Sequence, residues 1–227
     1  SITSSVSAGI TQGFSIGTYN GTGADNTVGH GLGVAPDMII VKCKSTAHDW
    51  VVYHSALGNA KILTLNATTA AQSATGWQST SPTSTVFSID NAANSLNQSG
   101  QSFVFYAFAS KKGYSKFGSY TGNGNADGTF VYTGFKPAMV LQKMSSSAGY
   151  SWHIFDNKRD TYNPIDKRLF PDTSDAESTG TNIDFVSNGF KFRSTGTGYN
   201  GSGNTFIYMA FSESPFVTST GIPTTAR

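Results

Sequence analysis

Phe103-Val-Phe-Tyr-Ala-Phe108 is the stretch that decides the fold, and Phe206-Ile-Tyr-Met-Ala-Phe211 repeats it 103 residues later. Both stretches are apolar at odd and even positions alike. A strand with one face in water alternates apolar and polar residues, so we expect these two to be central strands covered on both faces. Covered central strands need layered sheets, which favours a β-sandwich or jelly-roll arrangement.

The two stretches belong to a duplication, because other segments recur in the same order at offsets of 101 to 103 residues. Gly17-Thr-Tyr-Asn-Gly-Thr-Gly23 returns as Gly118-Ser-Tyr-Thr-Gly-Asn-Gly124, Pro36-Asp-Met-Ile-Ile-Val-Lys42 as Pro137-Ala-Met-Val-Leu-Gln-Lys143, and Trp50-Val-Val-Tyr-His54 as Trp152-His-Ile-Phe-Asp156. We therefore predict an all-β protein with little helix, made of tandem duplicated, jelly-roll-like β-sandwich subdomains that lie in close contact or interlock. Their predicted bounds are 13–110 and 111–213, after a lead-in at 1–12 from an upstream region and before a tail at 214–227.

Strand signals recur along both copies. We predict strands at 13–19, 37–43, 50–54, 61–65, 86–89 and 102–109 in the first copy, and at 114–120, 129–132, 138–144, 152–156, 184–186, 189–193 and 205–211 in the second. Asn-Gly dipeptides such as Asn20-Gly21 and Asn123-Gly124 separate them and adopt positive φ at low cost. Residues 56–74 and 160–180 lack clean alternation, so each is expected to hold a short helical turn or a long loop.

The composition excludes several function classes. Charged residues are 12 % of the chain, about half the share of an ordinary soluble domain, and Ser, Thr, Asn and Gly take their place, as in many secreted and virion β proteins. The net charge is +2 and no basic run exceeds Lys111-Lys112, so no nucleic-acid partner is expected. The apolar runs are far below the ~18 residues of a membrane span, so no membrane insertion is expected either.

Catalytic and metal-binding patterns are weak. Gly13-Phe-Ser-Ile-Gly17 fits the nucleophile elbow of hydrolases, but a turn follows it where the elbow needs a helix. The chain has only two Glu, Glu177 and Glu213, with no paired acidic motif, and its four histidines lack the spacing of metal ligands. Cys43 is the single cysteine, which excludes an internal disulfide. We expect no enzymatic activity, no cofactor and no metal.

Exposed aromatic side chains beside amides and hydroxyls are how β-sandwich surfaces bind sugars. Asp156-Asn-Lys-Arg-Asp160 is the densest charge cluster, and the first copy has His54-Ser-Ala-Leu-Gly58 in its place. This cluster is either a polar contact loop beside Trp152 and Tyr162 or a solvated turn with local ion pairs. The candidate ligand-binding residues are Trp77, Asp156, Arg159, Asp160, Tyr162 and Tyr199; core packing is the alternative for the aromatic ones, as it is for Trp50 and Trp152.

Several segments of this sequence are similar to those of one protein family. The segments that carry the likeness include Ser1-Ile-Thr-Ser-Ser-Val-Ser-Ala, Gly13-Phe-Ser-Ile, Val28-Gly-His-Gly-Leu-Gly-Val-Ala-Pro36, Gly113-Tyr-Ser-Lys-Phe-Gly-Ser-Tyr120, Asp156-Asn-Lys-Arg-Asp160, Ser187-Asn-Gly-Phe-Lys191 and Phe206-Ile-Tyr-Met-Ala-Phe-Ser-Glu213. Through them the chain resembles tailed-bacteriophage virion proteins, especially the C-terminal regions of tail-fibre-like proteins of marine phages. The resemblance covers nearly the whole chain but carries over no catalytic or binding residue.

The resemblance implies a non-enzymatic protein at the virion surface, a fibre, spike or knob module that contacts the host surface and its polysaccharides. Expected partners are other virion proteins and further copies of the chain, with a trimer if the protein is a tail fibre. One alternative is a structural or decoration protein of the capsid or tail with no receptor role. Another is a carbohydrate-binding lectin-like module, or a carbohydrate-active enzyme.

Overall fold

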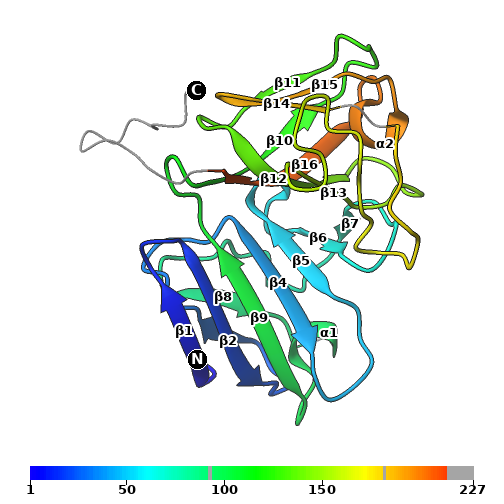
Figure 1. Ribbon diagram of the computed structural model, residues 1–227. Coiled ribbons are helices and arrows are strands. Elements are labelled where there is room, and N and C mark those ends of the chain that lie inside the picture. Colours follow the sequence, from blue (N-terminus) through cyan, green and yellow to red (C-terminus); the bar gives the residue numbers. More distant parts are fainter. Residues whose placement is uncertain (92–93, 181–182, 214–227) are drawn as a thin grey trace. The chain divides into compact units, whose positions relative to one another are not determined.

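Each half of the chain builds its own pair of β-layers, as the computed structural model shows (Figure 1). The structure describes residues 1–91, 94–180 and 183–213. It divides into a first unit, Ser1–Asn66 with Ala71–Ser110, and a second unit, Ala67–Ala70 with the chain from Lys111 onward. The short segment Ala67–Ala70 of the first copy thus belongs to the second unit, which the repeat pattern did not predict.

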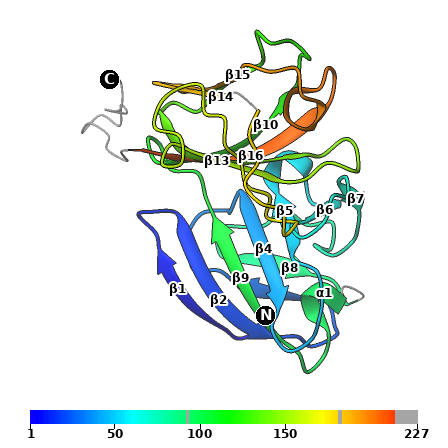
Figure 2. The ribbon, with the colours of Figure 1, turned by 45° about the vertical axis from the view of Figure 1, so that its right-hand side comes forward.

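The main layer of the first unit is a seven-stranded antiparallel sheet. Its strands in spatial order are β1 (Ser4–Gly9), β2 (Phe14–Asn20), β9 (Ser102–Phe108), β4 (Met38–Cys43), β5 (Val51–His54), β6 (Lys61–Thr64) and β7 (Gln72–Ser73). The second layer pairs β3 (Asn26–Gly29) with β8 (Val86–Ile89), and Figure 2 shows β8 behind β4 and β9. Because β9 lies between β2 and β4, the last strand of the first copy pairs with two strands from its first half.

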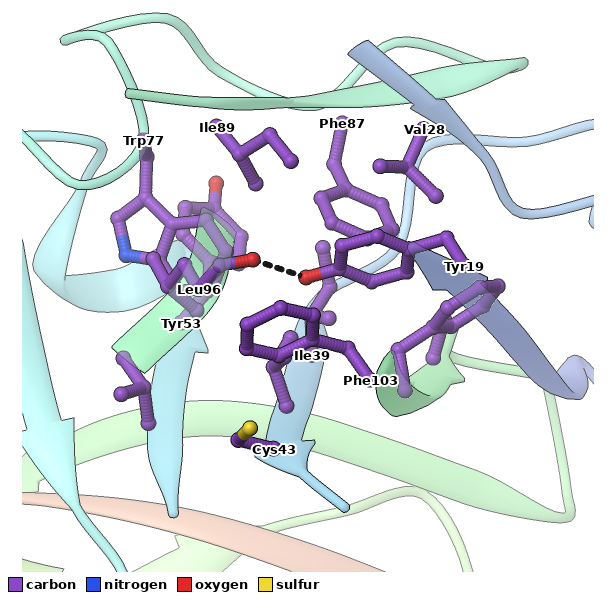
Figure 3. Close-up of a cluster of buried hydrophobic side chains, with 14 of the residues drawn as sticks. Tyr19, Val28, Ile39, Cys43, Tyr53, Trp77, Phe87, Ile89, Leu96 and Phe103 are labelled. Atoms are coloured by element: carbon purple, nitrogen blue, oxygen red, sulfur yellow. Dashed lines mark hydrogen bonds between the residues drawn. The ribbon is translucent and has the colours of Figure 1, made fainter. Parts of the chain in front are cut away.

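Aromatic side chains fill the space between these layers (Figure 3). Tyr19 of β2 stacks on Phe103 of β9 with ring centroids 5.1 Å apart, and its hydroxyl donates to the Leu96 carbonyl at 2.6 Å. Phe87 of β8 meets Phe105 of β9 edge-on at 5.3 Å. Each fully buried ring of this kind stabilises the fold by about 1.5–3 kcal/mol relative to an exposed one.

The second unit is built the same way with fewer strands. A four-stranded sheet contains β10 (Ser115–Thr121), β16 (Thr205–Ser212), β12 (Pro137–Met144) and β13 (His153–Asp156), and a three-stranded sheet contains β11 (Phe130–Tyr132), β15 (Gly189–Phe192) and β14 (Ile183–Val186). Tyr120 stacks on Phe206 at 4.8 Å and donates to the Tyr199 carbonyl at 2.7 Å. Tyr120 therefore repeats the contacts of Tyr19.

The all-β prediction is confirmed. Each predicted strand overlaps an observed one, and the helices in the described part of the chain are the four-residue α1 (Asn94–Asn97) and α2 (Thr197–Asn200) and the 3₁₀ turn η1 (Ser55–Leu57). Strands β3 and β7 were not predicted, and β1 lies inside the predicted lead-in 1–12. All three are short or poor in apolar residues, so periodicity does not reveal them.

The expectation of two covered faces is wrong for β9. Its residues alternate between buried and partly exposed, and the partly exposed face carries Tyr106, which stacks on Trp50 at 6.4 Å. Aromatic pairs across strands stabilise a sheet face even where water reaches it, so an apolar sequence does not require a second layer. In β16 the expectation is confirmed, because the five residues from Phe206 to Ala210 are all buried.

The two glycines of the repeated Tyr-x-Gly-x-Gly segment are required for different physical reasons. A Cβ on Gly21 would lie 2.2 Å from a backbone carbonyl oxygen, and one on Gly122 would lie 2.4 Å from another. The last glycine of each segment, Gly23 or Gly124, has a φ of 68°, which residues with a Cβ rarely adopt. The segment thus repeats because the chain passes close to its own backbone and then turns.

A buried asparagine at the end of each short helix holds this same turn. The Oδ1 atom of Asn97 accepts from the Thr22 N–H at 2.9 Å, and that of Asn200 accepts from the Asn123 N–H at 3.2 Å. Each amide nitrogen donates to the carbonyl two residues further along the turn, at 2.7 and 2.9 Å respectively. The duplication therefore preserves a hydrogen-bonded lock as well as a core.

Candidate functional site

The loop that follows β13 begins with a carboxylate-capped turn. Asp156 Oδ1 accepts from the backbone N–H groups of Lys158 and Arg159, both at 2.9 Å, and Arg159 Nε donates to Asp156 Oδ2 at 2.6 Å. Burial acts to raise the pKa of Asp156, but these hydrogen bonds outweigh it and lower that pKa. In the first copy the side chain of His54 accepts from the Ala56 N–H instead, at 3.2 Å.

The charged side chains of the loop are bound to one another. Arg159 lies 3.4 Å from Glu177 and donates to the Ile154 carbonyl at 3.1 Å. Lys167 donates to the Arg159 carbonyl at 3.3 Å and lies 3.9 Å from Glu177. Asp156 and Arg159, both proposed ligand residues, are thus engaged in holding the loop.

A pocket of about 230 Å³ opens beside this loop in the second unit. Its lining residues are Lys136, Asn157, Asp160, Thr161, Tyr162, Asn163, Ile165 and Phe185. The amide of Asn163 forms two 2.9 Å hydrogen bonds with the backbone N–H and carbonyl of Phe185. These bonds attach the loop to the edge of β14 that faces away from β15, where Ile165 also forms a β-bridge with Ile183.

The pocket combines an apolar floor, an exposed ring and polar groups. Ile165 and Phe185 are buried, whereas Tyr162 is 85 % exposed at the rim. Within the described residues, the buried Oδ1 atom of Asn157 has no hydrogen-bond partner. Asp160 uses Oδ2 to accept from the backbone N–H groups of the 166–167 segment at 2.8 and 2.7 Å. The arrangement has unused hydrogen-bonding capacity beside a flat aromatic face.

Lys136 supplies the cation of the pocket. Its Nζ atom lies 3.1 Å from a carboxylate oxygen of Glu213, and both side chains are about one-third exposed. A partly exposed pair of this kind contributes little to stability. It does offset the positive charge that Lys136 brings to the lining.

The structure corrects the expected surface position of Trp77. This side chain is 1 % exposed in the core of the first unit, where it meets Tyr53 edge-on at 5.7 Å and Phe87 at 6.3 Å (Figure 3). A ring enclosed in this way cannot stack on a ligand at the surface. The segment Gly76-Trp77-Gln78 resembles an exposed loop in sequence because it lies in a turn.

Tyr199 is also a core residue, so its expected ligand contact is wrong as well. It is 7 % exposed, packs on Phe192 at 5.8 Å, and forms a 3.0 Å hydrogen bond between its hydroxyl and that of Ser194. Its backbone carbonyl receives the Tyr120 hydroxyl. Of the six candidates, Asp160 and Tyr162 are the two that line one pocket.

Sequence reasoning missed several residues. Lys136 and Phe185 reach the pocket through pairing between distant segments, which no local pattern reports, whereas Asn157 lies within the Asp156–Asp160 cluster but was not among the candidates. Phe130 and Tyr132 are exposed rings on the outer face of β11, and Tyr132 is 59 % exposed. The strand predicted at 129–132 contained their signal, because inward Val131 forces its two neighbours outward.

A larger hollow of about 370 Å³ lies in the first unit. Its lining is mainly Val51, Ile62, Leu96 and small polar residues, and none of its described polar side chains is both buried and unpaired. Because a specific site needs convergent polar groups as well as volume, the pocket beside Tyr162 is the better candidate.

Across residues 1–91, 94–180 and 183–213, no group of three or more His, Cys, Asp or Glu side chains is arranged to hold a metal ion. In the same ranges no helix has the length and apolar character needed to cross a membrane.

The fold and the pocket together define a class: an all-β protein of two layered units that carries a small pocket of mixed polar and apolar lining at one sheet edge. The chain belongs to the family described as "Domain of unknown function (DUF7483)", whose model matches residues 1–215. No curated protein and no solved structure is significantly similar to it.

Proposed function

We propose that the protein is a non-enzymatic bacteriophage virion protein, a fibre, spike or knob module that contacts saccharides of the host surface. The observation that carries the proposal is the pocket in which the exposed ring of Tyr162 stands beside the unpaired amide of Asn157 and the carboxylate of Asp160. Sugars bind to proteins by stacking their C–H face on a ring and by hydrogen bonds between their hydroxyls and such polar groups.

The sequence supports the virion part of this proposal. The chain resembles tail-fibre-like proteins of marine phages over nearly its whole length, and its sequence is rich in Ser, Thr, Asn and Gly. A host-contact module is expected at the virion surface, attached to other virion proteins. Assembly of several copies, a trimer in a tail fibre, would turn a weak single site into strong attachment by raising the effective concentration.

A structural or decoration role is the second candidate, and strand β1 favours it. Residues Ser4–Gly9 form an edge strand, and in the described chain they pair on one side with β2. This edge carries no charge and no proline, the features that usually prevent another chain from adding a strand. It is therefore a suitable place for contact with a neighbouring virion subunit.

Binding of the complete recombinant chain to host cells, compared with virions from which the chain has been removed, separates the two roles. Host contact predicts binding to cells, weakened about tenfold by Tyr162→Ala, the equivalent of one well-placed ring. Tyr132→Ala is the matched control, because Tyr132 is an exposed tyrosine of the same unit that does not line the pocket. Binding to virions alone would establish the decoration role and contradict the host-contact proposal.

A further inference from the structure

The pocket beside Tyr162 has room for one sugar ring. Its volume of about 230 Å³ lies below the roughly 300–1,000 Å³ of sites that enclose drug-sized ligands. The buried side chains of Ile165 and Phe185 give it an apolar floor, which suits the C–H face of a pyranose. A longer glycan would place a single residue inside.

Two acceptor atoms of the lining have no donor among the described residues, and they lie beside the hydroxyl groups of Thr161 and Tyr162, which donate as well as accept. Asn157 Oδ1 is buried without a partner in the described part of the chain. Asp160 directs its two hydrogen bonds from backbone N–H groups to Oδ2, which leaves Oδ1 for a ligand. An acceptor without a donor costs free energy, so a ligand whose donors reach these atoms gains hydrogen bonds here. Hydroxyl groups are the donors of a neutral sugar.

The charge of the lining opposes an acidic ligand. Lys136 is paired with Glu213 at 3.1 Å, so its positive charge is offset inside the protein. The carboxylate of Asp160 has hydrogen-bond donors around it but no cation within ion-pair distance among the described residues. A ligand carboxylate placed here would face a like charge and the unpaired oxygen of Asn157.

We infer that the pocket binds a single neutral pyranose unit and discriminates against the matching uronic acid through Asp160. The inference rests on the proposed saccharide contact and adds the class of sugar. Asp160 provides both the hydrogen-bond acceptor for a hydroxyl and the repulsion of a carboxylate.

The test is a titration, followed by NMR, of the complete chain with methyl glycosides of glucose, galactose and mannose and of their three uronic acids. At least one neutral glycoside is expected to bind, and its uronic acid about tenfold more weakly. Asp160→Asn should reduce that difference to about threefold or less, since the amide oxygen can keep the two backbone hydrogen bonds while the ligand-facing NH2 group carries no charge. Asp127→Asn is the control, because Asp127 is an exposed carboxylate of the same unit outside the pocket.

Raising the salt concentration provides a second test that needs no variant. Salt screens the charge of Asp160, so it should reduce the difference in affinity between the neutral glycoside and its uronic acid in the unaltered protein. The inference would be overturned if a neutral glycoside and its uronic acid bound equally well, or if the difference in their affinities survived Asp160→Asn. It would also be overturned if no glycoside bound at concentrations up to about 50 mM. Cell binding that depends on Tyr162, found together with any of these results, would keep the proposed function and reject only the sugar class. Absence of cell binding would reject the function itself.

Discussion

Two asparagines of the same pocket have opposite roles. Asn163 is satisfied, because its amide holds the backbone N–H and carbonyl of Phe185. Asn157 is 8 % exposed, yet its Oδ1 atom has no partner in the described chain. A buried polar atom left unpaired lowers stability, and proteins commonly retain such a cost where a ligand later meets it.

This contrast predicts opposite effects of one substitution. Asn157→Leu, of similar shape, should raise the free energy of unfolding by about 1–3 kcal/mol, because it removes an unpaired buried amide. Asn163→Leu should lower the same free energy by about 1 kcal/mol, because two hydrogen bonds to Phe185 are lost. Urea denaturation of both variants measures the difference. Equal destabilisation would mean that Asn157 already has a partner in solution, such as an ordered water molecule.

At the scale of elements, the turns after β2 and β10 depend on close backbone approach. At Gly21 a Cβ would lie 2.2 Å from a carbonyl oxygen, and backbone cannot move aside as a side chain can. The Asn97 side chain also holds this turn, through its hydrogen bonds to the Thr22 N–H and the Ala24 carbonyl.

Gly21→Ala is therefore expected to destabilise the protein by about 1–3 kcal/mol, the usual range for overpacking. Gly29→Ala is the control in the same unit, since its Cβ would meet a serine hydroxyl at 3.3 Å and nothing closer. Thermal unfolding of both variants provides the comparison. If Gly21→Ala proved as mild as Gly29→Ala, the close approach would not be what maintains the glycine in both copies.

The elements were largely predictable from sequence because period-2 patterns and Asn-Gly turns are local signals. Strand β1 was not, since Ser4-Ser-Val-Ser-Ala-Gly9 has almost no apolar face and forms by pairing with β2. The site was half predictable. Asp160 and Tyr162 lie in a conspicuous loop, whereas Phe185 joins them only through the pairing of that loop with β14. The prediction for Trp77 was wrong because the residue type alone does not show whether a ring is buried or exposed.

At the scale of the whole molecule, the two halves keep separate cores. The cluster around Phe87 is made entirely of residues of the first unit, and the cluster around Phe190 entirely of residues of the second. Phe87 contacts Phe105 of β9 at 5.3 Å, and Phe190 contacts Tyr208 of β16 at 5.4 Å. A destabilising substitution in either core should therefore lower the stability of the strands of its own unit most.

Hydrogen exchange followed by mass spectrometry can resolve this, because β9 and β16 give separate peptides. Phe87→Ala and Phe190→Ala should each cost about 3–5 kcal/mol, the usual range for removing a buried ring. Phe87→Ala is expected to speed exchange in β9 far more than in β16, and Phe190→Ala to do the reverse. Equal acceleration of both strands by both variants would show one cooperative block, in which case the duplicated units share a single stability.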